Sequence, residues 1–580
     1  MALQFESSMQ HLVYQMDVGP GRKVIQAVLF GLFALAMATL YTFTNFQGLR
    51  DPRAFEEAQL GRRYAMVGQL ETQCVRPLAV GVLAARDEQK GGMVQGHPDL
   101  WHPPLWPLTL AAVYRLTGVA EVGAPTAAYV NAADYLPVAI SHFFACLAAL
   151  WVWLIARKLF DLRVAALSAG AYLLSDLIWR QSLAANDWSL ALFFALGAVY
   201  AALWAGEVPE GVEPEGGGEG PFWRWLVPLV VSALLTAAAL LSRYMAGAFG
   251  LAIFLYLGTS RRRRAWALAG LYAGLVAVLV APWLWRNIAL VGRPFGLACY
   301  GLLTETYLFP GDALFRSLSP ELPDWGSGIY AVQLKMMANL REFSAAGLGF
   351  GGAGVLLALF GAMYLHRFVR LSSRRLRWCL LPAGLVMVLL AAALGLESLQ
   401  ALKLFWPLAI PYAWAFLLVL LDRLQFEIRF FGAAVMTLVM FLAGLPLLLN
   451  VLPPRTGLPY PPYFHRYIGL TASMLKADEC MVTDIPWATA WYGGKTSLLL
   501  PRHVDDFYRI HKQHHPIALA YFTTETRDKP WVRGLSDPTA SEYSWYQIFA
   551  AGKVPADFPL SYGRYLGGSD QFLLTDKPRW

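Results

Sequence analysis

Several acidic residues in this sequence stand where they could catalyse a transfer reaction. Asp51, Glu56 and Glu57 open one polar segment, and Asn186-Asp187 comes directly before a long apolar stretch. A carboxylate that lies within hydrogen-bond reach of a hydroxyl can act as its general base. These four acids are therefore the candidate catalytic residues, and Asn186 is a candidate for contact with an acceptor.

Cationic and aromatic residues occur at the ends of the same apolar stretches. Arg243 and Tyr244 form a short turn between two of them. Arg286 follows a third stretch, and Lys403 begins a fourth. Arginine binds phosphate through parallel hydrogen bonds and lysine binds it as a point charge. Ionisable residues at the ends of membrane spans suggest function, although they can also snorkel to water, so we predict that these residues bind a lipid-linked phosphate.

Asp51 and Asp187 also have structural explanations. Asp51-Pro52 before AFEEAQLGRRYA is typical of a helix start, with Asp51 as the N-cap and Pro52 in the first turn. This helix is expected to be amphipathic, with its apolar residues on one face and Glu56 and Arg62 off that face. Asp187 can cap the helix that follows it in the same way. Catalysis and capping both stay open for these two residues.

The segment HPDLWHPP brings two histidines and a carboxylate, His97, Asp99 and His102, close together in the chain. Its spacing matches no common metal site, and its prolines favour extended backbone. We expect a rigid loop in which His97 and His102 serve the loop or the acceptor, and we assign no metal ligand. Whether a divalent metal takes part in the reaction is left open.

Composition identifies the class of protein. Of 580 residues, 57% are hydrophobic and 15% are charged, whereas a soluble domain carries roughly 25% charged residues. About eleven stretches have the roughly 17–25 residues that a bilayer requires. A shorter apolar stretch, 104–118, is expected to be interfacial or re-entrant. The eleven predicted spans are 24–46, 134–156, 163–180, 186–205, 223–241, 243–259, 265–283, 345–366, 377–395, 402–421 and 429–449.

The positions of the basic residues predict the orientation in the membrane. With the N-terminus inside, every dense group of Lys and Arg falls on the inner side, including the run Arg261–Arg264. That run is a topology signal and not a nucleic-acid patch. The sequence therefore predicts a multi-pass protein of the cytoplasmic membrane, with 1–449 as the membrane domain. Segments 47–133 and 284–344 of this domain, and the whole of 450–580, lie outside.

The tail 450–580 has no long apolar stretch and shows short strand-like segments instead. We predict a small α/β domain there. Cys74 and Cys480 both fall outside, where a disulfide is permitted. Trp491 and Tyr492 either bind a sugar acceptor or pack a small core. The predicted strands are Glu479–Asp484, Ser497–Leu500 and Ile517–Phe522.

Several segments together resemble one enzyme family. DPRAFEEAQLGRRYA, CVRPL and HPDLWHPPLWPLTLAAVYRLTG are similar to the first outer loop of bacterial GT-C glycosyltransferases. LAANDWSLALFFAL, LLSRYMAGAFGLAIF, APWLWRNIALVGRPFG and KLFWPLAIPYAWAFLLVLL resemble their later membrane segments in the same order, and CMVTDIPWATAWYGGKTSLLLP resembles their tail. The nearest group is glycosyltransferase family 39, the relatives of the dolichyl-phosphate-mannose–protein mannosyltransferases.

The resemblance implies an inverting transferase that takes mannose or another sugar from a polyprenyl-phosphate donor. Its acceptor would be a hydroxyl of a protein, lipid or glycan outside the cytoplasmic membrane. The family's catalytic base in the first outer loop falls on Asp51, with Glu56 or Glu57 as alternatives, because Pro52 stands where many relatives carry a second acid. The family's second acid falls on Asp187, and Arg243, Tyr244, Arg286 and Lys403 match positions that would contact phosphate.

Two other classes of protein share some of these features. A transporter of lipid-linked glycans also has many spans and cationic patches, but it favours internal repeats and polar groups near the middle of the membrane. A non-catalytic glycan-binding subunit would tolerate the loss of the acids. Because no repeat is visible and the polar groups gather at span ends, we favour the transferase.

Overall fold

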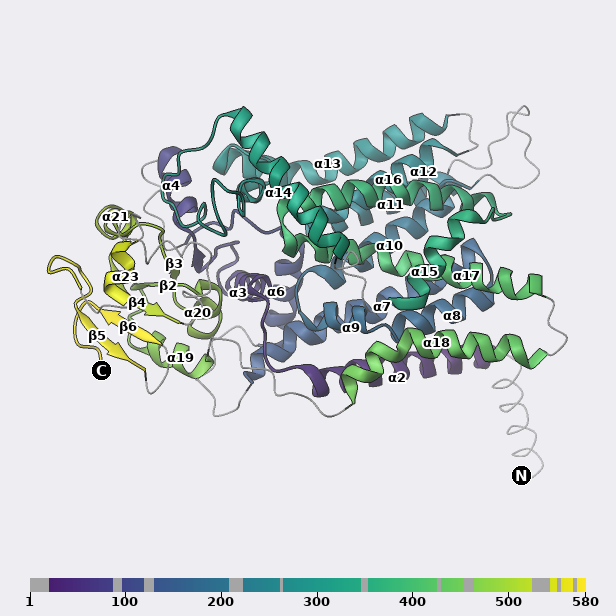
Figure 1. Cartoon of the computed structure of the whole chain (residues 1–580), viewed down its shortest axis with the longest axis horizontal. Helices are drawn as coiled ribbons and strands as arrows, with labels where there is room; N and C mark the ends of the chain where they lie inside the picture. The colour runs from purple at the N-terminus through teal and green to yellow at the C-terminus, as the bar shows by residue number, and fades with distance from the viewer. Residues whose placement is uncertain are drawn as a thin grey trace, which may run out of the picture.

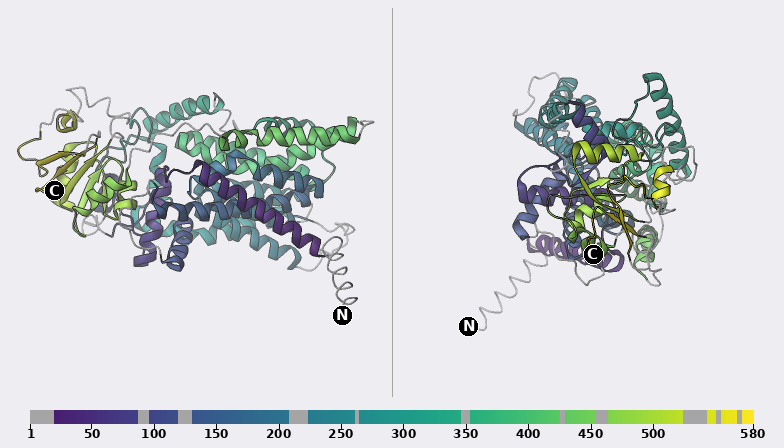
Figure 2. Two further views of the ribbon diagram at one scale, coloured as in Figure 1. Left: turned by 90° about the horizontal axis from the view of Figure 1, so that it is seen from below. Right: turned by 90° about the vertical axis from the view of Figure 1, so that its left-hand side faces the viewer.

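The protein has long helices at one end and a β-sheet at the other (Figure 1). A layer that contains α3 and α6 lies between them, and the view from below shows the same separation (Figure 2). The C-terminus lies at the sheet end. The computed structural model describes residues 20–86, 96–118, 130–207, 223–260, 264–345, 353–424, 429–452, 464–523, 543–549, 554–566 and 571–580.

The helix bundle accounts for most of the described chain. Its N-terminal helices are α2 (Pro20–Asn45), η1 (Ala132–Asp134), α7 (Tyr135–Leu159), α8 (Leu162–Leu173), α9 (Asp176–Leu183) and α10 (Trp188–Ala205). Its middle helices are α11 (Trp223–Ser242), η2 (Tyr244–Gly247), α12 (Ala248–Gly258) and α13 (Ala265–Val291). Its last helices are α15 (Gly354–Ala362), η5 (Met363–Leu365), α16 (Leu371–Leu394), η6 (Leu396–Phe405), α17 (Trp406–Leu424) and α18 (Arg429–Val451).

Among the described residues, eight helices are long and apolar enough to cross a membrane. A ninth span is the pair α8 and α9, which is bent by 49°. Two of the eleven predicted spans are shorter apolar helices instead, Tyr244–Gly258 and Gly354–Leu365. The first is shortened because Arg243 adopts extended backbone and the chain then makes a 3-10 turn before α12. Arg261, Arg262 and Arg263 of the basic run lie outside the described residues.

Helix α3 (Pro52–Val67) begins as the sequence predicts. Asp51 is its N-cap and accepts a hydrogen bond from the backbone N–H of Arg53 at 3.0 Å. The prediction of an amphipathic helix is wrong, because Glu56, Glu57 and Arg62 are buried along with the apolar residues. Helix α3 is covered on two sides, by α6 (Leu105–Thr117) and by α20 (Pro486–Gly493) of the tail.

The sheet of the tail confirms the predicted α/β character. All three predicted strands are present, and they run parallel in the order β3-β2-β4. Two strands near the C-terminus extend this sheet: β6 pairs antiparallel with β4, and β5 pairs antiparallel with β6. The strands are β2 (Cys480–Thr483), β3 (Ser497–Leu499), β4 (Ile517–Phe522), β5 (Tyr562–Tyr565) and β6 (Phe572–Thr575).

One strand of the sheet comes from the first outer segment. Residues Cys74–Val75 form β1, which pairs in parallel with β3 at the edge of the sheet. Because β3 lies between β1 and β2, Cys74 and Cys480 are separated by two strand spacings, roughly 9–10 Å. That separation is too long for a disulfide, and both cysteines are buried free thiols.

The remaining elements cover the sheet or connect it to the bundle. The outer segments contribute α4 (Pro77–Arg86), η3 (Gly296–Leu302) and α14 (Trp325–Ala345). The tail contributes α19 (His465–Ser473), α21 (Val504–Arg509), the π-helical turn η7 (Ile510–His514) and α23 (Tyr543–Phe549).

Candidate functional site

Asp187 lies where α3 meets the membrane helices, and its carboxylate is fully buried. One carboxylate oxygen accepts hydrogen bonds from Nε and Nη2 of Arg243, at 2.9 and 2.6 Å. The other accepts from Nη2 of Arg53 at 2.5 Å. Asp187 follows Ala185, whose φ of 58° lies in the left-handed region and turns the chain from α9 into α10. One buried acid thus neutralises two arginines from different elements.

Asp51 is the accessible acid of this cluster, because it is half-buried while Glu57 and Asp187 are fully buried. Besides capping α3, it accepts a hydrogen bond from Nδ2 of Asn186 at 2.7 Å. The Asn186 amide is itself oriented, because its Oδ1 accepts from the backbone N–H of Trp188 at 3.0 Å. The structure thus brings together Asp51, Asn186 and Asp187 from segments more than a hundred residues apart.

Glu57 faces the same cluster from the first turns of α3. Its two oxygens accept from Nε of Arg53 at 3.0 Å and from the backbone N–H of Asp187 at 3.1 Å. Burial and the neighbouring Asp187 carboxylate raise the pKa of Glu57 above its ordinary value, and the charge of Arg53 opposes them. Like charges held this close cannot both ionise freely, so a proton is favoured on this pair of acids.

Glu56 points away from Glu57, as expected for neighbours about 100° apart around a helix. It accepts hydrogen bonds from Nη2 of Arg76 at 2.6 and 2.8 Å. Its Oε2 also lies 3.1 Å from Nε2 of His102, and Nδ1 of His102 lies 3.0 Å from Oδ1 of Asp99. The imidazole therefore bridges two carboxylates in a second, connected group of charges.

The charges in this second group balance one another. Burial alone would lower the pKa of His102, but Asp99 and Glu56 raise it to about 10. Burial would likewise raise the pKa of Glu56, but Arg76 and His102 lower it to about 2. A carboxylate this acidic is a weak general base at neutral pH. The geometry therefore favours Asp51 over Glu56 as the proton acceptor.

Arg286 lies beside the second group, near the C-terminal end of α13. Burial would raise the pKa of Asp99, but His102 and then Arg286 lower it. Nη1 of Arg286 donates to Oδ1 of Asn287 at 3.0 Å. Tyr244 is nearby, because its hydroxyl accepts from Nε1 of Trp283 at 2.8 Å. In the described part of the chain, no carboxylate forms an ion pair with Arg286.

Lys403 lies on η6, which contacts η2 on the side of the bundle helices. Its Nζ donates to Oε1 of Gln400 at 2.5 Å, and Gln400 is held by Gln181 of α9. No ion pair to Lys403 occurs among the residues that the structure describes. Arg286, near Tyr244 of η2, and Lys403, on η6, are thus not ion-paired within the described ranges, whereas Arg243 is paired with Asp187.

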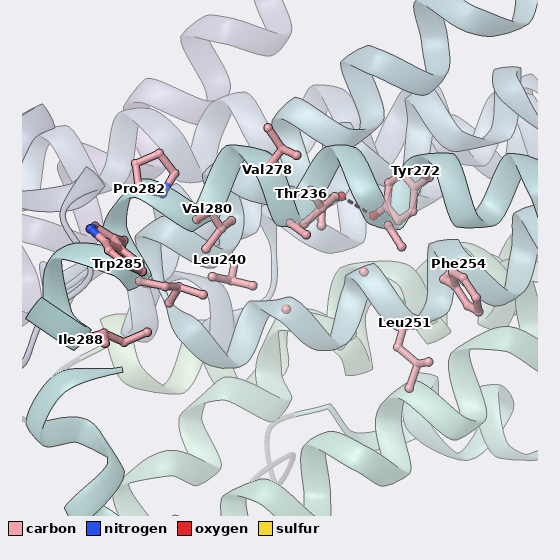
Figure 3. A pocket seen from close by; sticks show the side chains of 17 residues that line it. Thr236, Leu240, Leu251, Phe254, Tyr272, Val278, Val280, Pro282, Trp285 and Ile288 are labelled. Atoms are coloured by element: carbon pink, nitrogen blue, oxygen red, sulfur yellow. Dashed lines mark hydrogen bonds between the residues drawn. The ribbon is translucent and has the colours of Figure 1, made fainter. Parts of the chain in front are cut away.

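An apolar groove runs along the membrane helices α11, α12 and α13 (Figure 3). Its volume is about 890 Å³, and 17 residues of α11, η2, α12 and α13 line it. Trp285 and Ile288 lie at one end of the groove and Tyr272 and Phe254 at the other. The hydroxyls of Tyr272 and Thr236 lie 2.6 Å apart, so these two polar side chains satisfy each other. The end at Trp285 adjoins Arg286.

His97 is buried, and its backbone oxygen accepts a hydrogen bond from the backbone N–H of Thr72 at 2.8 Å. An isolated β-bridge between Glu71 and Pro98 joins the loop that carries His97 to the segment before it, and the predicted rigidity of the loop stays a prediction. Within the described ranges no group of three His, Cys, Asp or Glu residues is placed to hold a metal ion.

The tail contacts both η1 and α3 through buried polar side chains. Asp134 accepts from Nε1 of Trp491 at 2.8 Å and from the hydroxyl of Tyr492 at 2.7 Å. The guanidinium of Arg62 lies over the Trp491 ring at 4.3 Å and donates to the backbone oxygens of Ala490 and Trp491. Trp491 and Tyr492 are therefore core residues that fasten the tail to α3, which is the second of the two predicted alternatives.

Sequence reasoning missed Arg53 and Arg76 as members of the site. The spacing of Arg53 and Glu57 is a recognisable signal, because residues four apart on a helix are neighbours. No local pattern places Arg76 beside Glu56, since that contact depends on how β1 joins the sheet.

The combination of a helix bundle, an outer helical layer and a small sheet is the fold of the GT-C glycosyltransferases. ArnT from Cupriavidus metallidurans, solved bound to undecaprenyl phosphate, is similar with a TM-score of 0.54 and 12% identity over 95% of this chain and 98% of that chain. The oligosaccharyltransferase AglB from Archaeoglobus fulgidus was solved with an inhibitory peptide and a dolichol-phosphate. It is similar with a TM-score of 0.53 and 12% identity, over 87% of this chain and 70% of that chain. No family model and no curated protein sequence matches this chain.

Proposed function

We propose that this protein is a membrane glycosyltransferase that moves a sugar from a polyprenyl-phosphate donor to a hydroxyl acceptor at the outer face of the cytoplasmic membrane. The observation that supports this most is that the apolar groove ends at Trp285 and Ile288 of α13. The same helix carries Arg286, whose charge acts on Asp99 of the second buried charged group. ArnT and AglB, which share the fold, were solved with undecaprenyl phosphate and dolichol-phosphate. These two ligands support a donor of the same kind here.

The groove fits the lipid part of such a donor. From Tyr272 to Ile288 it follows α13 for roughly 24 Å, which is most of the hydrocarbon thickness of a bilayer. A polyprenyl chain in the groove would bring its phosphate toward Arg286, and Lys403 lies on η6, which contacts η2. Both cations would stabilise the negative charge that develops on the phosphate as it leaves. Arg243 instead acts as a positioning residue for Asp187.

Asp51 is the proposed base. Its carboxylate takes the proton of the acceptor hydroxyl while the acceptor oxygen forms a bond to the anomeric carbon. The bond from that carbon to the phosphate oxygen breaks, and its electron pair leaves with the phosphate. Attack from the face opposite the phosphate inverts the anomeric centre. Asn186 orients Asp51 from one side, and Asp187 and Glu57 hold the arginines that shape the site.

The resemblance to family 39 supports mannose as the first sugar to test, with pentoses and other hexoses next. It supports a protein as the first acceptor, with a lipid or a growing glycan as the others. No nucleotide and no other cofactor is required for this scheme, and a nucleic acid is not among the proposed partners.

The experiment uses the purified full-length protein in lipid nanodiscs with radiolabelled polyprenyl-phosphate-mannose and a lysate of acceptors. Loss of the donor is followed for wild type, Asp51→Asn and Arg286→Gln. The matched control is Glu71→Gln, which removes a carboxylate from the same outer segment and breaks only its ion pair with Arg63. We expect the control to behave like wild type, Asp51→Asn to lose turnover, and Arg286→Gln to raise the KM for the donor.

Two results would count against the proposal. If every polyprenyl-linked sugar stays intact with the wild-type protein, the transferase is wrong, and movement of the intact lipid-linked sugar across the bilayer would favour the transporter. If the donor is consumed equally by Asp51→Asn, the transferase stands and the base is another acid of the cluster.

A further inference from the structure

A second, basic pocket lies at the end of the helix bundle away from the charged site. It has a volume of about 340 Å³ and forms where η5 ends and α16 begins. The backbone oxygen of Leu394, at the other end of α16, accepts a hydrogen bond from Lys335 of the outer segment at 3.2 Å. Arg377 of the pocket lies roughly 26 Å from Leu394 along the helix, close to the thickness of the hydrocarbon core of a bilayer.

The pocket combines positive charge with aromatic rings. The described residues that line it include no acid, so no carboxylate of the lining neutralises its arginines. Its charged and aromatic members are Arg367, Arg374, Arg377, His366, Tyr364 and Trp378.

Arg377 forms the floor of the pocket, and only 3% of this residue is exposed. Its Nη1 donates to the backbone oxygens of Met363 at 2.9 Å and His366 at 2.5 Å. Its Nε is buried and has no hydrogen-bond partner among the described residues. A buried guanidinium N–H without an acceptor is costly, so an anionic oxygen bound in the pocket would complete the hydrogen bonds of Arg377.

The rim of the pocket is apolar and open to the surroundings. Leu365 of the lining is 93% exposed and Trp378 is half exposed, and Val369, two residues beyond Arg367, is 98% exposed. Water around such side chains would be unfavourable, whereas acyl chains would cover them, and tryptophan is typical of the membrane interface. A cationic pocket with an apolar rim matches an amphiphile better than a free anion.

We propose that this pocket binds the phosphate headgroup of an anionic phospholipid in the membrane leaflet opposite the charged site. The phosphate oxygens would accept hydrogen bonds from Nε of Arg377 and from Arg367 and Arg374 at the mouth, and the acyl chains would run over Leu365 and Val369. Basic pockets between membrane helices bind anionic headgroups in this way. The inference does not depend on the proposed transferase activity.

The test is native mass spectrometry of the full-length protein released from vesicles of phosphatidylglycerol and phosphatidylcholine. We expect wild type to retain phosphatidylglycerol and not phosphatidylcholine. The double variant Arg367→Gln/Arg374→Gln is expected to lower that retention by roughly tenfold or more, because each arginine contributes to phosphate binding. The matched control is Arg163→Gln, which removes one exposed arginine near the same end of the bundle and should retain the lipid.

Each of the other outcomes also supports or overturns the proposed lipid site. Equal retention in the double variant and in wild type would overturn the proposal, as would equal loss in Arg163→Gln, which would show a general charge effect. Displacement of the lipid by millimolar inorganic phosphate alone would show a free-anion site instead. Thermal unfolding of each variant separates loss of the fold from loss of the site. Arg374→Lys keeps the positive charge, so it should retain more phosphatidylglycerol than Arg374→Gln if the charge binds the lipid.

Discussion

Replacing Asp51 by asparagine separates its charge from its role as a helix cap. Asparagine caps helices about as well as aspartate, so α3 should keep its N-terminus. If Asp51 is the general base, the substitution removes the proton acceptor. Turnover should then fall by about 10²–10⁴-fold, which is the usual contribution of a positioned base.

The structure also predicts a defined cost in stability for this substitution. Both oxygens of Asp51 accept hydrogen bonds, one from the backbone of Arg53 and one from Nδ2 of Asn186. An asparagine at this position has only one acceptor. Asn186 cannot rotate its amide without losing the bond from Trp188 to its Oδ1. The side-chain amide N–H of Asn186 would therefore face the new side-chain amide N–H at position 51. We expect the free energy of unfolding to fall by about 1–3 kcal/mol.

The exchange variant Asp51→Asn/Asn186→Asp distinguishes the two roles. Its new carboxylate, at position 186, would accept both from the new side-chain amide at position 51 and from the backbone of Trp188. The hydrogen bond thus returns while the carboxylate moves. We expect the Tm of the exchange variant to return toward wild type and donor consumption to stay low. If the exchange variant recovered both Tm and turnover, Asp51 would be a structural residue and the assignment of the base would be refuted.

Three further predictions concern the surroundings of the site. Asp187→Asn leaves the buried Arg243 guanidinium without its acid and takes one of two acids from the half-buried Arg53, so it should lower stability by about 3–5 kcal/mol, measured by thermal unfolding. Because the folded pKa of His102 is raised to about 10, its contribution to stability should be lost as the pH rises from 7 through 10. A His102→Gln variant should lack that pH dependence of Tm. Gly81→Ala places a Cβ 1.7 Å from the backbone oxygen of Leu318 and should unfold at lower temperature, whereas Gly270→Ala, with open space around it, should not.

Much of the fold could be predicted because it rests on local patterns. The apolar stretches are long enough to satisfy their backbone hydrogen bonds as helices, and that requirement identifies most of the spans from sequence alone. Asp51-Pro52 predicts the start of α3, and three β-rich segments predict β2, β3 and β4. The two predicted spans that form shorter helices are the exceptions. The first of them, Tyr244–Gly258, is short because the turn at Arg243 depends on how the helices pack around η2.

The candidate site could be predicted only in part. The acids and cations were recognisable from their positions at span ends, but their pairing was not. Asp187 joins Arg53 and Arg243 over long separations in the chain, and Glu56 meets Arg76 and His102 only because β1 joins the sheet of the tail.

The sequence by itself determined that the chain is a multi-pass membrane protein and which residue types are available for chemistry. These follow from hydropathy, charge and capping, which act between neighbours in the chain. Only the tertiary structure decided which acid is accessible, which arginines are paired and where an apolar groove forms. Such properties depend on burial and on contacts between distant segments, because a charge is neutralised or desolvated by whatever group the fold places beside it.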